Sequence, residues 1–197
     1  MERPAQVETE QSVLQLPEGL PVPVDDGAAD HLPGKAMPLA RLRSTQGSSF
    51  ALIDLPMGRS LIFVYPRTGR PARKLPQGWS DIPGARGCST ELISVRDDFD
   101  ALRTAGARAV YGLSTHDSAH QIEAARRLNL PYPLLADPTC EVGRVLKLPT
   151  FEVDGVTYYK RLTLVVQDCV IEKVFYPIFP PNTHAAEVLT WLRGRRR

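Results

Sequence analysis

The 197-residue sequence contains little cysteine and no long hydrophobic run. Its three cysteines, Cys88, Cys140 and Cys169, are too few and too scattered for a disulfide framework, which indicates a reducing compartment. No apolar run approaches the ~18 residues that a membrane span needs, and the N-terminus lacks the apolar core of a signal peptide. We therefore expect a cytoplasmic protein with no membrane partner.

The sequence motifs of several cofactor sites are absent as well. No Cys-x-x-Cys pair occurs, which disfavours a dithiol oxidoreductase, and neither a Gly-x-Gly-x-x-Gly segment after a strand nor a phosphate loop is present. His116 and His120 have the spacing of two metal ligands on one helical face, but they lack the His-Glu-x-x-His signature. Surface histidines at a helix start are preferred over a zinc site, and we expect no metal or other cofactor.

Charge is unevenly distributed along the chain, although its net value is only +2. Residues 1–34 contain seven acidic residues, one arginine and five prolines, which predicts a mobile arm or a loosely docked extension. Residues 35–193 are expected to form the folded domain, and 194–197 an arginine-rich tail. No aromatic residues are interleaved with the basic ones in the tail, so no nucleic-acid partner is expected.

Hydrophobic periodicity predicts alternating strands and helices from residue 50 onward. This alternation favours an α/β fold, a thioredoxin-like three-layer sandwich with a mixed central sheet and helices on both faces. Between the second strand and the first helix lies an inserted basic loop, 66–87, rich in glycine and proline. Strands are expected at 50–55, 60–65, 107–113, 132–136, 161–167 and 170–176, and helices at 89–105, 117–128, 141–146 and 183–193.

Cys88 is the residue whose position most clearly favours chemical reactivity. It lies between the glycine-rich loop and the first turn of a helix, where unpaired N–H groups and the helix dipole favour a thiolate. Arg86 adds positive charge nearby. The position therefore predicts a lowered pKa and a thiolate at neutral pH. The alternative is that Cys88 is a small buried hydrophobic residue, as many free cysteines are.

Four segments of the sequence resemble the peroxiredoxin family, nearest to its bacterioferritin comigratory protein class. The segment Pro83-Gly84-Ala85-Arg86-Gly87-Cys88-Ser89-Thr90-Glu91, followed by Arg96-Asp97, is similar to the family's active-site segment. Three further segments match the family. Residues 62–66 resemble the strand that leads to the active site, and residues 132–138 resemble a Pro-Leu-Leu-x-Asp segment. Residues 161–166 resemble the strand that begins with an arginine facing the thiolate. The resemblance extends from about Gly34 to Leu192.

This resemblance implies a thiol-dependent peroxidase with Cys88 as the peroxidatic cysteine. Its thiolate would attack hydrogen peroxide or an organic hydroperoxide and become a sulfenic acid, with Arg161 stabilising the developing charge. The substrate-binding residues implied are Pro83, Gly87, Ser89 and Thr90. The implied partners are the peroxide and a thiol reductant, which is thioredoxin, glutaredoxin or a low-molecular-weight thiol, and the chain would be a monomer or homodimer.

The sequence departs from the family pattern in two respects. Asp81 and Ala85 occupy the positions usual for proline and a hydroxyl residue, so Pro83 and either Ser89 or Thr90 would have to substitute for them. Ile93 occupies the usual position of the resolving cysteine, which favours recycling by an external thiol, with Cys140 as a possible resolving residue. A catalytically lapsed thioredoxin-like binding module is the alternative. The loop 66–87 could cover the pocket, bind the reductant or simply be solvated.

Overall fold

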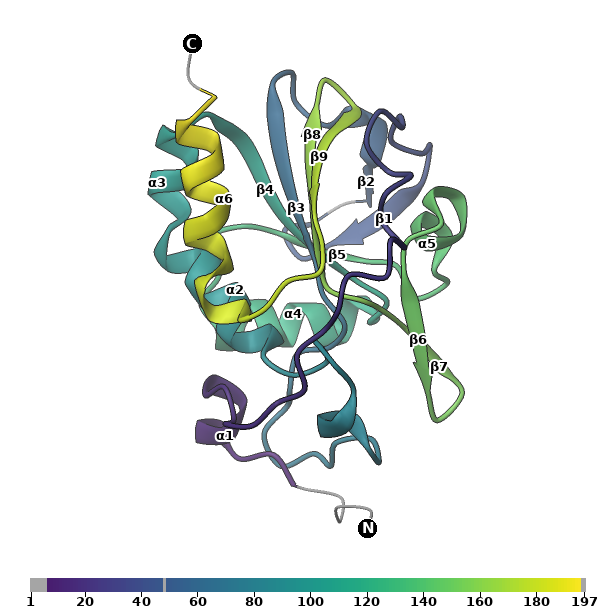
Figure 1. Cartoon of the computed structure of the whole chain (residues 1–197), viewed down its shortest axis with the longest axis vertical. Helices are drawn as coiled ribbons and strands as arrows, with labels where there is room; N and C mark the ends of the chain where they lie inside the picture. The colour runs from purple at the N-terminus through teal and green to yellow at the C-terminus, as the bar shows by residue number, and fades with distance from the viewer. Residues whose placement is uncertain (1–6, 48, 196–197) are drawn as a thin grey trace.

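The computed structural model describes residues 7–47 and 49–195. Its main feature is a seven-stranded mixed sheet with the strand order β2-β1-β5-β4-β3-β8-β9 (Figure 1). The strands are β1 (Arg41–Ser44), β2 (Ser49–Ala51), β3 (Arg59–Val64), β4 (Ala107–Ser114), β5 (Leu134–Ala136), β8 (Leu162–Gln167) and β9 (Val170–Phe175), with a separate hairpin of β6 (Thr150–Val153) and β7 (Val156–Tyr159). The helices are α1 (Glu10–Leu14), α2 (Cys88–Asp97), α3 (Phe99–Thr104), α4 (Ser118–Arg127), α5 (Glu141–Leu146) and α6 (His184–Arg193).

The central strand β3 is buried on both faces because hydrophobic clusters cover both sides of the sheet. It pairs in parallel with β4 and antiparallel with β8. Leu61 and Phe63 face a cluster with helices α2, α3, α4 and α6, whereas Ile62 and Val64 face a cluster with α5 and residues 29–42. Successive side chains thus alternate between the two faces of the sheet, as they do in any extended strand. The expected three-layer, thioredoxin-like sandwich with a mixed sheet is thus confirmed.

Some predicted elements were wrong in detail. The helix expected over 89–105 is divided at Asp98, whose φ of −93° and ψ of 3° interrupt the helical path between α2 and α3. The strand expected over 50–55 ends at Ala51, after which a 3₁₀ turn follows, and it pairs with β1. Strand β1 was missed because Leu42 is its only buried residue, too little for a periodic signal.

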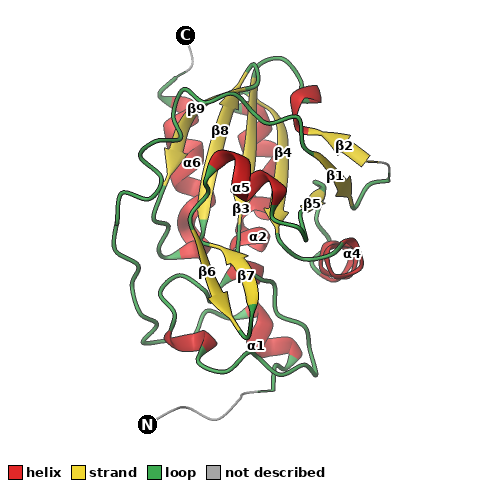
Figure 2. Cartoon of the chain, turned by 90° about the vertical axis from the view of Figure 1, so that its right-hand side faces the viewer, coloured by secondary structure: helices red, strands yellow, loops and turns green. Residues whose placement is uncertain are grey.

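The N-terminal segment and the loop 66–87 lie together below the sheet (Figure 2). The backbone of Glu8 pairs with that of Ala72 and Arg73, and Leu32, further along the segment, is fully buried. In the loop, Trp79 is 2% exposed and packs against the β6–β7 hairpin. Residues 7–34 are therefore docked on the domain in this structure, and the loop has a small hydrophobic cluster of its own.

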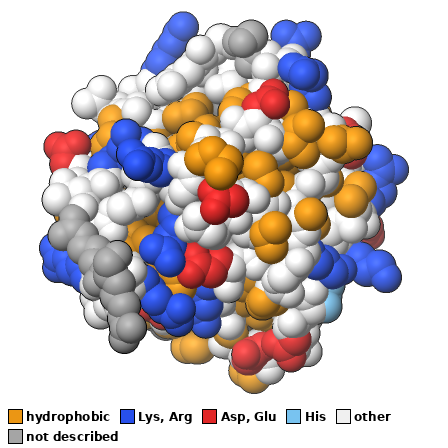
Figure 3. Space-filling view, turned by 90° about the horizontal axis from the view of Figure 1, so that it is seen from above, with side chains coloured by type: hydrophobic (Ala, Val, Ile, Leu, Met, Phe, Trp, Pro, Cys, Tyr) orange, Lys and Arg blue, Asp and Glu red, His pale blue; other side chains and the backbone are white. Residues whose placement is uncertain are grey.

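Seen from the end of the molecule opposite α1, the surface has hydrophobic, basic and acidic side chains interspersed (Figure 3). Among the described residues, no helix is both long and apolar enough to cross a membrane. The cysteine singled out from the sequence lies away from this end, beyond the last residue of β3 and at the start of α2.

Candidate active site

Cys88 is the first residue of α2, and the preceding Gly87 caps the helix with a φ of +90°. This left-handed conformation favours glycine. A Cβ atom on Gly87 would also approach within 2.5 Å of the Pro181 side chain and 2.7 Å of the Leu16 side chain. Gly87, predicted from the sequence to bind substrate, thus allows the chain to turn closely into the helix and directs the Cys88 thiol toward the site.

Two donors from other parts of the chain converge on the Cys88 sulfur. Arg161 Nη2 donates to Sγ at 3.2 Å, and the backbone N–H of Arg67 donates at 3.3 Å. Arg161 immediately precedes β8, and Arg67 follows β3, so the pairing of these two strands brings the donors to one point. The structure therefore brings together Cys88 and Arg161, the two residues predicted to be catalytic, and adds Arg67.

A buried carboxylate fixes the orientation of Arg161. Glu91 is fully buried and accepts a hydrogen bond from Arg161 Nη1, while Nη2 also donates to the carbonyls of Gly84 and Arg86 at 3.1 and 2.9 Å. Glu91 was not among the site residues expected from the sequence, although its position three residues after Cys88 places both on one helical face. No sequence signal could identify Arg67, because its backbone and not its side chain makes the contact.

The predicted lowering of the Cys88 pKa is wrong for this closed arrangement. Burial raises the pKa of the Cys88 thiol above its ordinary value; the charge of Arg161 and the Arg67 N–H act in the opposite direction. The thiol is only 2% exposed, and removal from water penalises the charged form. Burial also raises the pKa of Glu91, which Arg161 partly offsets. Desolvation outweighs the helix terminus on which the sequence prediction rested.

This pKa direction predicts a steep pH dependence for any reaction of the Cys88 thiolate. Because the thiolate is the nucleophile, its second-order rate constant with hydrogen peroxide should rise about tenfold per pH unit and continue rising beyond ~8.5, the ordinary thiol value. Stopped-flow measurements between pH 6 and 10 test this expectation. A rate constant that no longer changes with pH below neutral pH would instead support the lowered Cys88 pKa expected from the sequence.

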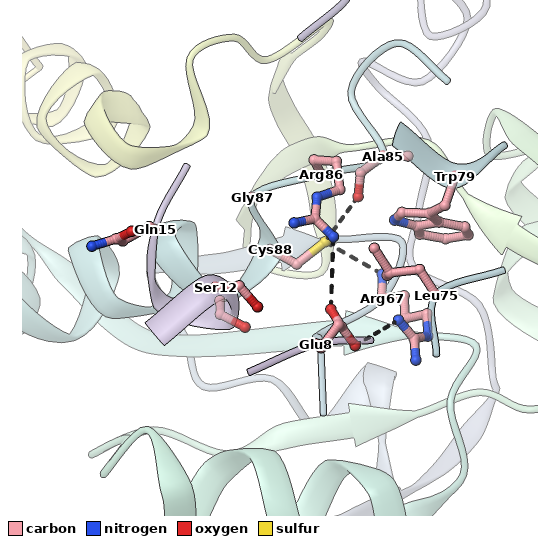
Figure 4. Close-up of a pocket in the computed structure, with 12 residues that line it drawn as sticks. Glu8, Ser12, Gln15, Arg67, Leu75, Trp79, Ala85, Arg86, Gly87 and Cys88 are labelled. Carbon is pink, nitrogen blue, oxygen red and sulfur yellow. Dashed lines mark hydrogen bonds and ion pairs between the residues drawn. The ribbon is translucent and has the colours of Figure 1, made fainter. Parts of the chain in front are cut away.

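A small cavity lies directly over Cys88 (Figure 4). Ser89 is one of the residues that line it, and its hydroxyl is buried with no hydrogen-bond partner among the described residues. Thr90 instead donates to the Gly87 carbonyl at 2.9 Å, in the first turn of the helix. Pro83 lines a different cavity of about 180 Å³, on the side of Arg161 that faces Tyr176. Of the four predicted substrate-binding residues, Gly87 and Ser89 line the cavity at the sulfur.

The other two cysteines lie apart from this site. Cys140 caps α5 and packs in the hydrophobic cluster on one face of the sheet, whereas Cys88 belongs to the cluster on the other face. Burial raises the pKa of Cys140, which a hydrogen bond with Tyr159 partly offsets. Cys169 occupies the β8–β9 turn, where its sulfur lies 3.3 Å from the Ile53 carbonyl. All three cysteines are free thiols.

The predicted pair of surface histidines is instead a packed pair. His116 and His120 stack with ring centroids 3.7 Å apart, and His120 Nε2 lies 2.9 Å from the Thr68 hydroxyl. Burial is the main cause that lowers the pKa of His116 to about 3 and that of His120 to about 4, and the charges of the nearby Arg67 and Arg70 contribute to both shifts. Within residues 7–47 and 49–195, no group of three or more potential ligands could hold a metal ion.

The architecture and the site together define a class of protein. A thioredoxin-like sheet with a cysteine at the start of the helix after its central strand is the arrangement of a thioredoxin-fold protein with a functional thiol. The Redoxin family model matches residues 32–189. The chain therefore belongs to the Redoxin family, and the resemblance to peroxiredoxins of the bacterioferritin comigratory protein class is confirmed.

Individual relatives agree with this assignment. Peroxiredoxin Bcp of Escherichia coli is 28% identical over 166 residues, covering 81% of this chain and 94% of the relative. Chloroplastic peroxiredoxin Q of rice is 23% identical, and this chain spans only 66% of its length. The structure of peroxidoxin BcpB from Mycobacterium tuberculosis has a TM-score of 0.68 at 24% identity and covers 84% of this chain and 99% of its own, a likeness that shows the fold.

Proposed function

We propose that this protein is a thiol-dependent peroxidase that reduces hydrogen peroxide or organic hydroperoxides at Cys88. The observation that carries the proposal is the convergence of Arg161 and the Arg67 N–H on the Cys88 sulfur inside a buried cavity. Both donors stabilise negative charge, first on the thiolate and then on the peroxide oxygen next to it. A relative from Xanthomonas campestris is described as having alkyl peroxide reduction activity, which supports the reaction class.

In the proposed reaction the Cys88 thiolate attacks one peroxide oxygen. A sulfur–oxygen bond forms as the oxygen–oxygen bond breaks. The departing oxygen takes up one proton from solvent, equivalent to the proton that the thiol released on ionisation, and leaves as water or an alcohol. Sulfur is oxidised to a sulfenic acid and the peroxide is reduced. Arg161 and the Arg67 N–H stabilise the developing charge at the sulfur.

An external thiol completes the proposed cycle. Thioredoxin, glutaredoxin or a low-molecular-weight thiol would condense with the sulfenic acid and release water, and a second thiol would then free Cys88 as the reductant becomes a disulfide. Cys140 packs on the opposite face of the sheet, so a direct disulfide would require rearrangement. Three free thiols fit a reducing, cytoplasmic compartment, and the proposed assembly is a monomer or homodimer.

A catalytically lapsed binding module is the second candidate, favoured by the near-complete burial and raised pKa of Cys88. Stopped-flow mixing with hydrogen peroxide separates the two. The peroxidase should oxidise at a rate constant above that of free cysteine by about 10²-fold or more, since each well-placed donor contributes on that scale. Replacing Cys88 with serine should abolish the reaction, whereas a Cys169→Ser variant should keep it.

Intact-mass analysis after one equivalent of peroxide then tests the route of recycling. We expect the mass of one added oxygen on Cys88, or its adduct with a sulfenic-acid probe, in both the natural protein and a Cys140→Ser variant. Loss of two hydrogens through a Cys88–Cys140 disulfide would overturn recycling by an external thiol but not the peroxidase. Oxidation no faster than that of free cysteine would instead support the binding module.

A further inference from the structure

Glu8 is a buried carboxylate held by two arginines near Cys88. Its side chain is 3% exposed and lies 3.4 Å from Arg67 Nη1 and 3.7 Å from Arg86 Nη1. The backbone N–H of Arg70 donates to the same carboxylate at 3.0 Å. Both arginine side chains are about nine-tenths buried. A glutamate carboxylate is almost never fully buried unless it is paired. The partners of Glu8 are residues that lie close to the Cys88 thiol.

The Glu8 contacts fasten residues 7–16 over the Cys88 cavity. Glu8, Ser12 and Gln15 line one side of the cavity, opposite Cys88 and the loop 66–87 (Figure 4). An antiparallel bridge between Val7 and Lys74 continues the attachment at one end of the segment. At the other end, the Leu16 side chain lies against Gly87. This segment, residues 7–16, thus forms one wall of the cavity at the thiol.

The resulting cavity is small. Its volume is about 20 Å³. A cavity of roughly 10 to 15 Å³ on this measure holds one water molecule. Hydrogen peroxide, with two oxygen atoms, is only slightly larger than water and fits with minor adjustment. The substituent of an alkyl hydroperoxide needs more room beside the sulfur than this cavity offers while residues 7–16 form its wall.

We propose that Glu8 is a specificity-determining residue, which restricts access to Cys88 to hydrogen peroxide by holding residues 7–16 in place. This inference rests on the proposed peroxidase function and narrows its substrate class. Arg67 and Arg86 both line the cavity and carry like charges, and the Glu8 carboxylate compensates both. Without that charge the two guanidinium groups repel each other. The wall is then held by the backbone hydrogen bonds of Glu8 with Ala72 and Arg73 without these ion pairs, so the cavity opens to larger hydroperoxides more readily.

The test compares two peroxides in stopped flow, hydrogen peroxide and tert-butyl hydroperoxide. In the natural protein the rate constant for hydrogen peroxide should be the larger by at least about tenfold. Glu8→Gln should raise the rate constant for tert-butyl hydroperoxide by about tenfold, because charged hydrogen bonds hold the wall. The rate constant for hydrogen peroxide should change much less. Glu8→Asp, which keeps the charge on a shorter side chain, should give an intermediate ratio.

Glu18→Gln is the matched control, because Glu18 belongs to the same acidic stretch, is exposed, and makes no contact with another charged group among the described residues. It should leave both rate constants unchanged. Thermal unfolding of each variant shows whether the domain stays folded, and alkylation of Cys88 by a bulky maleimide, faster in Glu8→Gln, measures opening independently of peroxide chemistry.

The outcomes separate this inference from the proposed function. If the natural protein reduces both peroxides equally fast, or if Glu8→Gln changes neither the ratio nor the alkylation rate, Glu8 does not determine specificity although the peroxidase stands. If Cys88 reacts with hydrogen peroxide no faster than free cysteine in the natural protein and in Glu8→Gln alike, the proposed function itself fails.

Discussion

Replacing Arg161 with methionine should lower the rate constant for oxidation of Cys88 by about 10²- to 10³-fold. Arg161 is the cation in contact with the sulfur, and it lowers the Cys88 pKa against the effect of burial. Its removal therefore reduces the thiolate population and leaves the developing charge on the peroxide with one donor fewer. The pH profile of the variant should also shift toward higher pH, a change that a loss of packing alone does not produce.

The buried Arg161–Glu91 pair complicates this experiment and also supplies its control. Removing only Arg161 leaves the Glu91 carboxylate buried without its cation, which costs about 3 to 5 kcal/mol of stability. An Arg161→Met/Glu91→Gln double variant contains no such charge and should regain most of that stability while remaining slow. Arg59→Met, at the far end of β3, removes a half-buried arginine paired with Glu172 and should leave the rate unchanged. A fast double variant would exclude the catalytic role of Arg161.

The stacked histidines predict a second large effect, a loss of stability in acid. The folded-state pKa values of His116 and His120 are lowered to about 3 and about 4, far below the unfolded value of 6.5. Below pH 6.5 the unfolded chain therefore binds protons that the folded protein does not. The stability that these neutral rings contribute is complete above pH 6.5 and is lost as pH falls toward 4 and then 3.

The size of this effect follows from the two groups together. Where only the unfolded state titrates, each histidine lowers the free energy of unfolding by about 1.4 kcal/mol for each pH unit of acidification. The pair therefore lowers it by about 3 kcal/mol per pH unit below pH 6. Urea unfolding at several pH values measures the slope. A His116→Asn/His120→Asn double variant, less stable at neutral pH because the stack is lost, should show a much shallower decline. An equal slope in both proteins would assign the acid sensitivity to other groups.

The fold and the position of the reactive cysteine were accessible from sequence because both depend on local patterns. Continuous apolar runs identified the central strands, and the expected helix over residues 141–146 coincides with α5. The glycine-rich turn before Cys88 and the motif around it indicated a cysteine at a helix start, and the arginine that begins the strand after residue 160 was expected to face it. Short strands with one buried residue, such as β1, lacked such a pattern.

The thioredoxin-like architecture followed from hydrophobic periodicity in the sequence, which is a short-range property of the chain. The choice of Cys88 and Arg161 as site residues came from the position of Cys88 at a helix start and from the resemblance to peroxiredoxins. The direction of the Cys88 pKa shift, the burial of Glu91 and the place of Glu8 beside the cavity follow from tertiary packing alone. These features depend on how completely segments distant in the chain exclude water from one point. Desolvation is a property of the assembled packing, and no residue type or local spacing encodes its extent.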